Sequence, residues 1–222
     1  MNLLVLDTET GGVSPEYSSL KEVACVVIKN EKIVHKYSSY VKSYNGTYTC
    51  TDFARKMHGI TDEMLEKQGK YPHNIIIDLQ EIRDVYFDGE PIIVVAHNSA
   101  FDISFVKKMF LDAEKNMGNM NISYNDVFSR NAIDTASLAL VLKMQNKLPF
   151  ERCSLDNILK FYKVEMPEGK RHTALADAEQ TAKAFMLMYK HLSGERVDVN
   201  SFDDVYETGY NDQQKITSSP ER

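Results

Sequence analysis

Five short runs of β-branched and aliphatic residues, and the order in which they occur, most constrain the fold of this chain. Residues 2–6 form the first run, and residues 23–28 and 32–41 form a pair separated by a polar turn, which predicts a hairpin. The later runs at 92–96 and 131–134 each lead directly into a segment that we expect to be helical. Three early strands followed by strands that alternate with helices favour an α/β fold, in which a sheet of mixed direction carries helices on both faces.

Most of the remaining segments are expected to be helical. Residues 173–192 carry apolar side chains close to a 3.6-residue period, which is typical of an amphipathic helix. Residues 118–130 are polar and predict a loop. Helices are also expected within 51–88, where Thr61 is a candidate N-cap, and at about 100–117, 135–144 and 154–162.

The 222 residues suit one compact domain with a tail. Hydrophobic residues make up 43% of the chain, an ordinary share for a globular protein, so a sizeable core is expected. We place the domain at residues 1–193. Residues 194–222 have few aliphatic side chains and seven acids against three bases, which predicts an acidic, weakly ordered tail.

Composition excludes several classes of protein. The three cysteines are widely spaced, which excludes a disulfide framework and a paired-cysteine zinc site and indicates a reducing, cytoplasmic location. No apolar run reaches the roughly 18 to 20 residues that a membrane span needs, and the first residues lack the features of a secretory signal. The formal net charge of −6 argues against a protein whose whole surface coats nucleic acid, but it is compatible with a local site that handles phosphate through metal ions.

Asp7 and Glu9 come at the end of the first predicted strand. Because strand side chains alternate, both carboxylates project from the same face, about 6 to 7 Å apart along the backbone. Two acids at this spacing repel each other unless a cation lies between them, and a divalent ion is the usual answer. The alternative is a solvated strand end, although the carboxyl ends of buried strands are where α/β proteins place their sites.

Asp102 lies in the first turn of the helix predicted after residues 92–96. On its own it reads as a capping acid, with Ser99 as the N-cap three residues earlier. If the strands at 2–6 and 92–96 are neighbours, however, their carboxyl ends lie about 5 Å apart. Asp102 would then stand beside Asp7.

His172 and Asp177 form the third element. Five residues apart on one helix, their side chains would project about 140° apart, which is poor for a shared task. Thr173 can instead serve as the N-cap, which leaves His172 in the preceding loop and Asp177 in the opening turns of the helix.

Taken in order, these elements resemble the DnaQ-like 3′–5′ exonucleases of the DEDDh type. The segments AHNSAFDISFV and RHTALADAEQTAKAF look especially like the proofreading epsilon subunit of bacterial DNA polymerase III and its stand-alone relatives. The resemblance covers about residues 1–192. It implies an RNase H-like fold with a five-stranded mixed sheet.

The resemblance also implies roles for the residues. In such relatives four acids hold two Mg2+ or Mn2+ ions and a histidine acts as general base. By this resemblance Asp7, Glu9 and Asp177 bind the first cation, and Asp7 bridges to a second cation that Asp102 steadies. His172 takes the proton from the attacking water, since imidazole titrates near neutral pH.

Four further residues are candidates for substrate binding. Thr10 and Gly12 could let the backbone approach a terminal 3′-hydroxyl, although glycines after a strand also form simple turns. Val13 is either a wedge against a base or a core residue. His58 belongs to the segment MHGIT, which resembles a family segment near the terminal nucleotide.

The leading hypothesis is a metal-dependent exonuclease that removes 5′-mononucleotides from single-stranded or frayed DNA 3′ ends. An RNA-trimming or oligoribonuclease-type enzyme of the same fold stays open, because the catalytic residues do not encode sugar preference. An aspartate-nucleophile phosphatase is disfavoured because the second acid is Glu9 rather than an aspartate. A catalytically silent interaction module is opposed by the intact acids. The sequence shows no polymerase domain, so proofreading would occur in trans, with a DNA polymerase subunit as partner.

Overall fold

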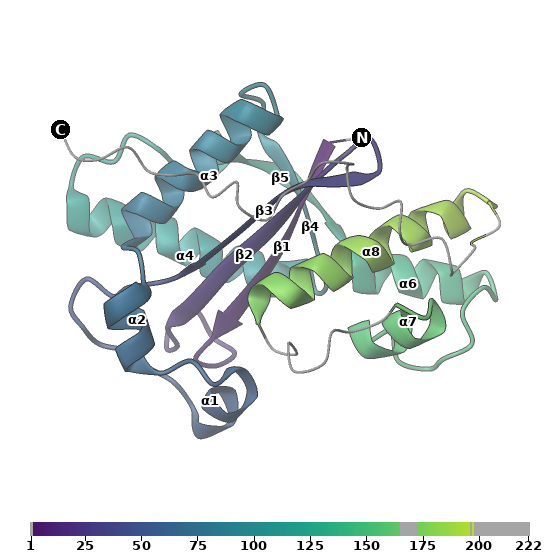
Figure 1. Ribbon diagram of the computed structural model, residues 1–222, viewed down its shortest axis with the longest axis horizontal. Helices are drawn as coiled ribbons and strands as arrows, with labels where there is room; N and C mark the ends of the chain where they lie inside the picture. Colours follow the sequence, from purple (N-terminus) through teal and green to yellow (C-terminus); the bar gives the residue numbers. More distant parts are fainter. Residues whose placement is uncertain (1, 165–172, 196, 198–222) are drawn as a thin grey trace.

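The computed structural model describes residues 2–164, 173–195 and 197. Within them, five strands form one sheet in the order β3-β2-β1-β4-β5 (Figure 1). The strands are β1 (Asn2–Thr10), β2 (Leu20–Lys29), β3 (Lys32–Tyr40), β4 (Ile92–Ala96) and β5 (Phe128–Asp134). The helices are α1 (Asp52–His58), α2 (Asp62–Gln68), α3 (Pro72–Tyr86), α4 (Ser99–Met117), α5 (Tyr124–Val127), α6 (Thr135–Met144), α7 (Leu155–Phe161) and α8 (Ala174–Leu192).

The sheet is mixed, as the order of the strands predicts. β1 pairs antiparallel with β2, and β2 pairs antiparallel with β3, which confirms the early hairpin. β4 lies parallel to β1 on its other side, and β5 lies parallel to β4. The carboxyl ends of β1, β4 and β5 therefore meet at one edge of the sheet, where α/β proteins place their sites.

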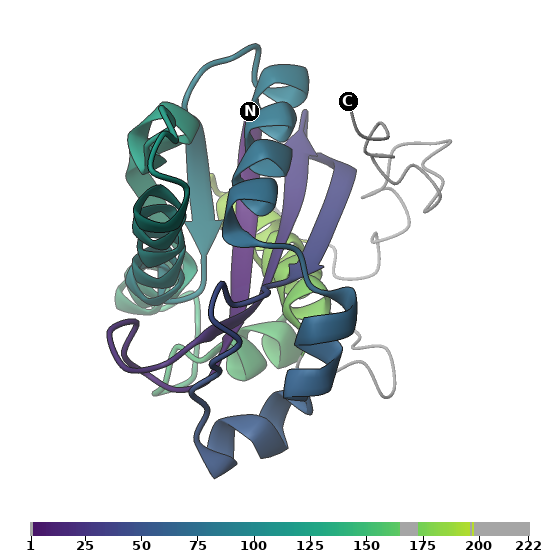
Figure 2. The same ribbon diagram turned by 90° about the vertical axis from the view of Figure 1, so that its left-hand side faces the viewer.

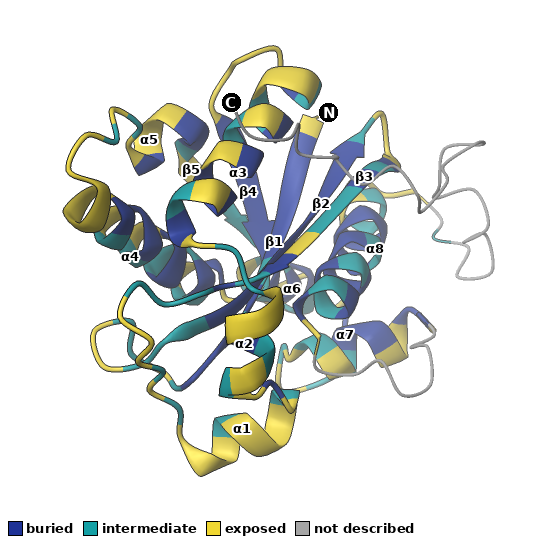
Figure 3. Ribbon diagram, turned by 60° about the vertical axis from the view of Figure 1, so that its left-hand side comes forward, coloured by how far each residue is buried: buried dark blue, intermediate teal, exposed yellow. Residues whose placement is uncertain are grey.

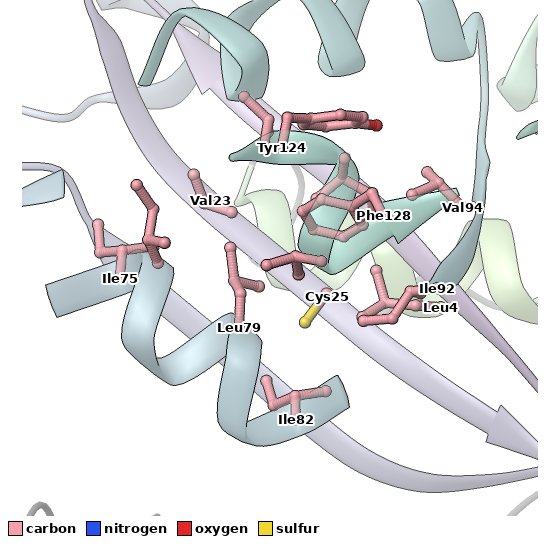
Figure 4. Close-up of a cluster of buried hydrophobic side chains, with 14 of the residues drawn as sticks. Leu4, Val23, Cys25, Ile75, Leu79, Ile82, Ile92, Val94, Tyr124 and Phe128 are labelled. Carbon is pink, nitrogen blue, oxygen red and sulfur yellow. The ribbon is translucent and has the colours of Figure 1, made fainter. Parts of the chain in front are cut away.

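Alternation along β1 divides the core between the two faces of the sheet. Leu4 and Leu6 pack on one face with residues of α3 and α4, and Figure 4 shows this cluster around Cys25. Leu3 and Val5 point to the opposite face and pack beneath α8. Figure 2 shows the sheet between α4 on one side and α8 on the other, which confirms helices on both faces.

α8 is buried along most of its length because it has neighbours on two sides. Ala178, Ala182 and Phe185 contact the sheet, and Ala184 and Met188 pack with residues of α6 and α7. Small alanine side chains allow α8 to approach the sheet closely. The first turn of α8 is thereby held over the end of β1.

Several predicted helix starts are confirmed by their caps. Thr61 accepts a hydrogen bond from the Met64 backbone N–H at the start of α2. Thr173 accepts one from the Ala176 N–H at the start of α8, as the interpretation of His172 and Asp177 requires.

One expectation for the strands was confirmed in detail, and one for a loop was wrong. β1 extends beyond the apolar run at 2–6 as far as Thr10, which confirms that Asp7 and Glu9 lie at the end of the strand and alternate with Thr8. The polar stretch at 118–130 is not a loop throughout, since its second half contains α5 and the start of β5. A capping box in which Asp126 accepts from the Ser123 backbone N–H and hydroxyl makes the short α5 stable.

The predicted tail lies outside the described residues except for positions 194, 195 and 197, so it stays a prediction. Among the described helices, none combines the length and the apolar character that crossing a bilayer requires.

Candidate active site

Three carboxylates from the two ends of the domain meet at the carboxyl edge of the sheet. Asp7 and Glu9 continue the row of Leu3 and Val5 on β1, so they face α8. Asp177 lies in the first turn of α8. One carboxylate oxygen from each of these three acids lies within 4.8 Å of those of the other two.

Asp102 approaches the same edge from α4. The Thr8 hydroxyl donates a buried hydrogen bond of 2.8 Å to Asp102 Oδ1, and the Asp102 side chain is almost inaccessible to solvent. β1 and β4 are neighbours, so the short connection from β4 to α4 brings Asp102 near Asp7. This is the position predicted for Asp102 if the two strands lie side by side. The sequence therefore predicted this juxtaposition correctly.

The capping role considered for Ser99 was wrong. Asn98 is the N-cap of α4, in the left-handed region at φ 66°, and no side chain caps the helix. Asp102 instead bonds to Thr8 on β1, 94 residues earlier in the chain. A local capping pattern is thus overridden by a tertiary hydrogen bond.

The acids are electrostatically strained without a cation. Burial, and then the charges of Asp102, Asp177, Glu9 and Glu22, raise the pKa of Asp7 well above its ordinary value. Burial and the charge of Asp177 raise the pKa of Glu9 to about 8. Burial raises the pKa of Asp102 to about 7, against the opposing hydrogen bond from Thr8. Near neutral pH the cluster therefore holds protons, unless positive charge replaces them.

This donor set fits hard divalent cations. All of the grouped donors are carboxylate oxygens, the ligands that Mg2+ and Mn2+ prefer, and no softer donor belongs to the group. The pKa values of Asp7 and Glu9 are raised by burial and then by mutual repulsion, and a bound cation would offset both by favouring the charged carboxylates. Asp7, Glu9 and Asp177 are thus the residues of the described chain suited to hold one.

Glu22 was missed by the sequence analysis. It lies directly opposite Glu9 in the β1–β2 ladder and is buried. Its carboxylate accepts hydrogen bonds from the Ser38 hydroxyl (2.6 Å) and from the Ala174 backbone N–H (3.2 Å), so it joins β2 to β3 and to the first turn of α8. The available signal was an acid inside the apolar run LKEVACVV, but only the strand register shows what it faces.

The loop after β1 carries three of the predicted binding residues. Thr10 is buried, and its hydroxyl donates to the Gly12 carbonyl at 2.7 Å. A Cβ on Gly12 would lie 2.5 Å from Ser18 Oγ, so a larger side chain would force that serine to shift. Val13 is 87% exposed, which excludes a core role and is compatible with the predicted wedge.

His58 lies at the end of α1 beside this loop. Its Nδ1 accepts a hydrogen bond from the Ile60 N–H at 2.9 Å, and Nε2 lies 3.9 Å from Cys50 Sγ. Burial and the charge of Lys21 lower the pKa of His58, while a hydrogen bond with the Thr10 backbone opposes this. The structure thus brings together His58 and Thr10, as expected for one binding surface.

His172 lies outside the described residues, so its predicted role as general base rests on the resemblance alone. The described residues begin again at Thr173, four residues before Asp177. Asp177 belongs with Asp7, Glu9 and Asp102 to the group of carboxylates that we call the acid cluster.

Comparison with known proteins agrees with this geometry. The family described as RNase_T: Exonuclease matches residues 4–185. The PolC-type DNA polymerase III of Mycoplasmopsis pulmonis is 29% identical over 197 residues, covering 88% of this chain but 12% of that protein. The DNA polymerase III epsilon subunit of Buchnera aphidicola (subsp. Baizongia pistaciae) is 29% identical over 198 residues, covering 83% of this chain and 69% of that subunit. The chain thus spans about an eighth of the PolC-type polymerases that it matches.

Solved structures share the fold. Exonuclease X in complex with 5′ overhanging duplex DNA superposes with a TM-score of 0.60 at 23% identity, covering 87% of this chain and 94% of that one. The nuclease domain of 3′hExo, a DEDDh family member bound to rAMP, gives 0.66 at 16% identity, covering 89% and 96%. The family match extends over most of the chain and includes Asp7, Glu9, Asp102 and Asp177. The chain therefore belongs to the RNase T family of DEDDh exonucleases, which are hydrolases acting on nucleic acid and are homologous to the exonuclease domains of PolC and of the epsilon subunit.

Proposed function

We propose that this chain hydrolyses the 3′-terminal phosphodiester of single-stranded or frayed DNA and releases 5′-mononucleotides, using two Mg2+ ions for which Mn2+ can substitute. The observation that supports this most directly is the meeting of Asp7, Glu9 and Asp177 within 4.8 Å, with pKa values of Asp7 and Glu9 raised by burial and mutual repulsion.

The side chains would have different roles in binding the cations and in moving the proton. Asp7, Glu9 and Asp177 would hold one cation, and Asp7 together with Asp102 would hold the second. Bound divalent cations supply positive charge for the scissile phosphate and make a water more acidic. His172 would take the proton from the attacking water, and Thr8 would keep the Asp102 carboxylate oriented through its hydrogen bond.

The terminal nucleotide would be held by the loop after β1 and by α1. Thr10 and Gly12 would present backbone to the terminal 3′-hydroxyl, Val13 would contact a base, and His58 would line the same surface. His58 is positioned for this by its contacts with Thr10 and Ile60.

The proposed biological setting is supported by the relatives. Homology to PolC and to the epsilon subunit favours proofreading in partnership with a DNA polymerase. A reducing, cytoplasmic location is part of the proposal and rests on the small number and wide spacing of the cysteines. RNA trimming is the second candidate, because one structural neighbour is bound to rAMP.

The test is degradation of matched DNA and RNA strands labelled at the 5′ end, and of a primer with a 3′ mismatch, in Mg2+, Mn2+, Ca2+ or EDTA. We expect a ladder of shortened DNA products in Mg2+ and Mn2+ only, since Ca2+ binds carboxylates with longer bonds and looser geometry. Faster loss of the RNA strand would select the RNA-trimming alternative. Hydrolysis in excess EDTA, or no hydrolysis of either strand with any cation, would overturn the proposal.

A further inference from the structure

α1 is a helix without a buried side chain. None of its seven residues is buried, and Figure 3 shows it as an exposed element at the lower edge of the molecule. Phe53 is 75% exposed and Met57 is 41% exposed. Most helices of globular proteins are stabilised by burying an apolar face, so the exposed apolar residues of α1 need another explanation.

The helix is nevertheless held firmly at both ends. The Thr51 backbone N–H donates to the Gly11 carbonyl at 2.7 Å, and the Thr51 side chain caps the helix by accepting from the Ala54 N–H at 3.2 Å. At the other end, His58 bonds to the Ile60 N–H and contacts the Thr10 backbone. α1 is therefore fixed to the end of β1, the strand that carries Asp7 and Glu9, and to the loop after it, while none of its side chains is buried.

Phe53, Lys56 and Met57 share one flank of α1, which we call the α1 ridge. With 100° per residue, Met57 projects about 40° from Phe53 on one side and Lys56 about 60° on the other. Lys56 takes part in no ion pair among the described residues, whereas Lys67 on the next helix bonds to Glu63 at 2.6 Å. An exposed aromatic ring, a flexible thioether and a cation that has no ion pair within the described part of the chain are thus presented together.

We propose that the α1 ridge binds the substrate strand next to its 3′-terminal nucleotide, with a base stacked on Phe53 and Met57 and a phosphate near Lys56. This rests on the proposed exonuclease function. Single-stranded nucleic acids are bound by aromatic side chains that stack on bases and by cations that follow the backbone. The ridge offers both, and α1 is joined to the loop after β1 by the hydrogen bond from the Thr51 N–H to the Gly11 carbonyl and by that between His58 and the Thr10 backbone.

The consequence is a preference for unpaired 3′ ends. A base stacked on Phe53 cannot remain stacked and paired in a duplex, so binding at the ridge would oppose a paired terminus and favour a frayed or mismatched one. The ridge would in this way contribute specificity without any contact to the reacting phosphate.

Two substrates separate the ridge from the acid cluster. The p-nitrophenyl ester of thymidine 5′-monophosphate contains the reacting phosphate but no neighbouring base, whereas a single-stranded 12-residue oligonucleotide reaches the ridge. For Phe53→Ala we expect an unchanged kcat/KM on the ester and a KM for the oligonucleotide raised about five- to 150-fold, the range for loss of one stacked base. Phe53→Tyr keeps the ring and should behave as wild type.

Binding without turnover provides a second readout. With 2-aminopurine as the penultimate base and Ca2+ in place of Mg2+, wild type should change the fluorescence of the probe on binding, and Phe53→Ala should abolish that change. Met144→Ala removes a side chain of similar exposure (77%) on α6 and is the matched control. Both variants should melt at the wild-type temperature, since neither side chain is buried.

Each result has one meaning. If the wild-type protein hydrolyses neither the ester nor the oligonucleotide, the proposed function itself is overturned. If the wild-type protein is active and Phe53→Ala has the same KM and the same fluorescence change, the proposal that the α1 ridge binds the substrate strand is overturned. The same result is expected if the ridge binds a protein partner instead. An equal loss on the ester and the oligonucleotide would place Phe53 at the terminal nucleotide and likewise overturn the proposal.

Discussion

The acid cluster and the α1 ridge adjoin the same end of β1 but are built in opposite ways. Asp7 and Glu9 are carried by the central strand of the sheet, where burial and then the charges of other carboxylates raise their pKa values. The α1 ridge exposes apolar side chains and contributes nothing buried. The first region is costly for folding and positioned rigidly, as a cation site must be. The second is nearly neutral for folding, so its residues can be selected for contact with a substrate.

The comparison predicts that variants of Asp7 lose activity without losing stability. Asp7→Ala should remove nearly all hydrolysis in Mg2+, because Asp7 would contact both cations. In EDTA the same variant should melt at the wild-type temperature or above it, since one of several repelling carboxylates is gone. Turnover assays and thermal melting check the two halves. The isosteric Asp7→Asn controls for lost volume, and retained turnover above about a tenth of wild type would remove Asp7 from the site.

His172→Ala should lower kcat by about 10² to 10⁴ while leaving Mn2+ affinity unchanged, because a general base contributes to the transition state rather than to metal binding. The acid limb of the pH–rate profile should flatten, since no imidazole then has to be neutral. Single-turnover kinetics and calorimetric Mn2+ titration on one preparation decide the matter. A parallel loss of metal binding and activity would assign His172 a structural or ligand role instead.

The same contrast explains which features the sequence could predict. The mixed sheet follows from the order of the hydrophobic runs, and the nearness of Asp102 to Asp7 follows if the strands at 2–6 and 92–96 are neighbours. The place of Asp177 in the opening turns of α8 follows from the Thr173 cap, whereas its meeting with the other acids was implied by the family resemblance. The Ser99 cap was wrong because a capping pattern is local, whereas the partner that Asp102 takes is set by the packing of β1 beside β4. Glu22 was missed because its meaning depends on strand register, which composition and spacing do not contain.

Glu22 provides an intermediate test, because it is buried among the acids but hydrogen-bonded to α8. Glu22→Ala should destabilise the protein by about 1 to 3 kcal/mol, since the Ser38 hydroxyl and the Ala174 N–H lose a buried partner. Glu22→Gln keeps an acceptor for the Ala174 N–H and removes one like charge near Glu9, so it should cost less. Chemical denaturation in EDTA compares the two. Equal losses in both variants would mean that the charge, rather than the hydrogen bonds, holds α8 in place.

The strained carboxyls also predict a pH dependence of stability in the absence of metal. The folded pKa of Glu9, about 8, and that of Asp102, about 7, lie above the values near 4 of unfolded chains. Between these limits the folded state binds more protons than the unfolded state, so stability contributed by these groups is full below about pH 4 and is lost as the pH rises to about 8. In EDTA the melting temperature should therefore fall from pH 5 to pH 8. Mg2+ should flatten this slope, and so should Glu9→Gln; a wild-type slope that rises over this range would contradict the raised pKa values.

Val13 should show the smallest effect and the opposite pattern from Asp7. Because its side chain is 87% exposed, Val13→Ala should change the free energy of unfolding by less than about 0.5 kcal/mol, with or without Mg2+. If Val13 contacts a base, losing two methyl groups from that contact removes at most about 1.6 kcal/mol, so kcat/KM on single-stranded DNA should fall about two- to ten-fold. Activity on the nucleotide ester distinguishes the contact: a wedge against the terminal base lowers both rates, and a contact further along the strand lowers only the rate on the oligonucleotide. Wild-type kinetics on both substrates would leave Val13 as a solvent-exposed loop residue and confine substrate recognition to His58 and the α1 ridge.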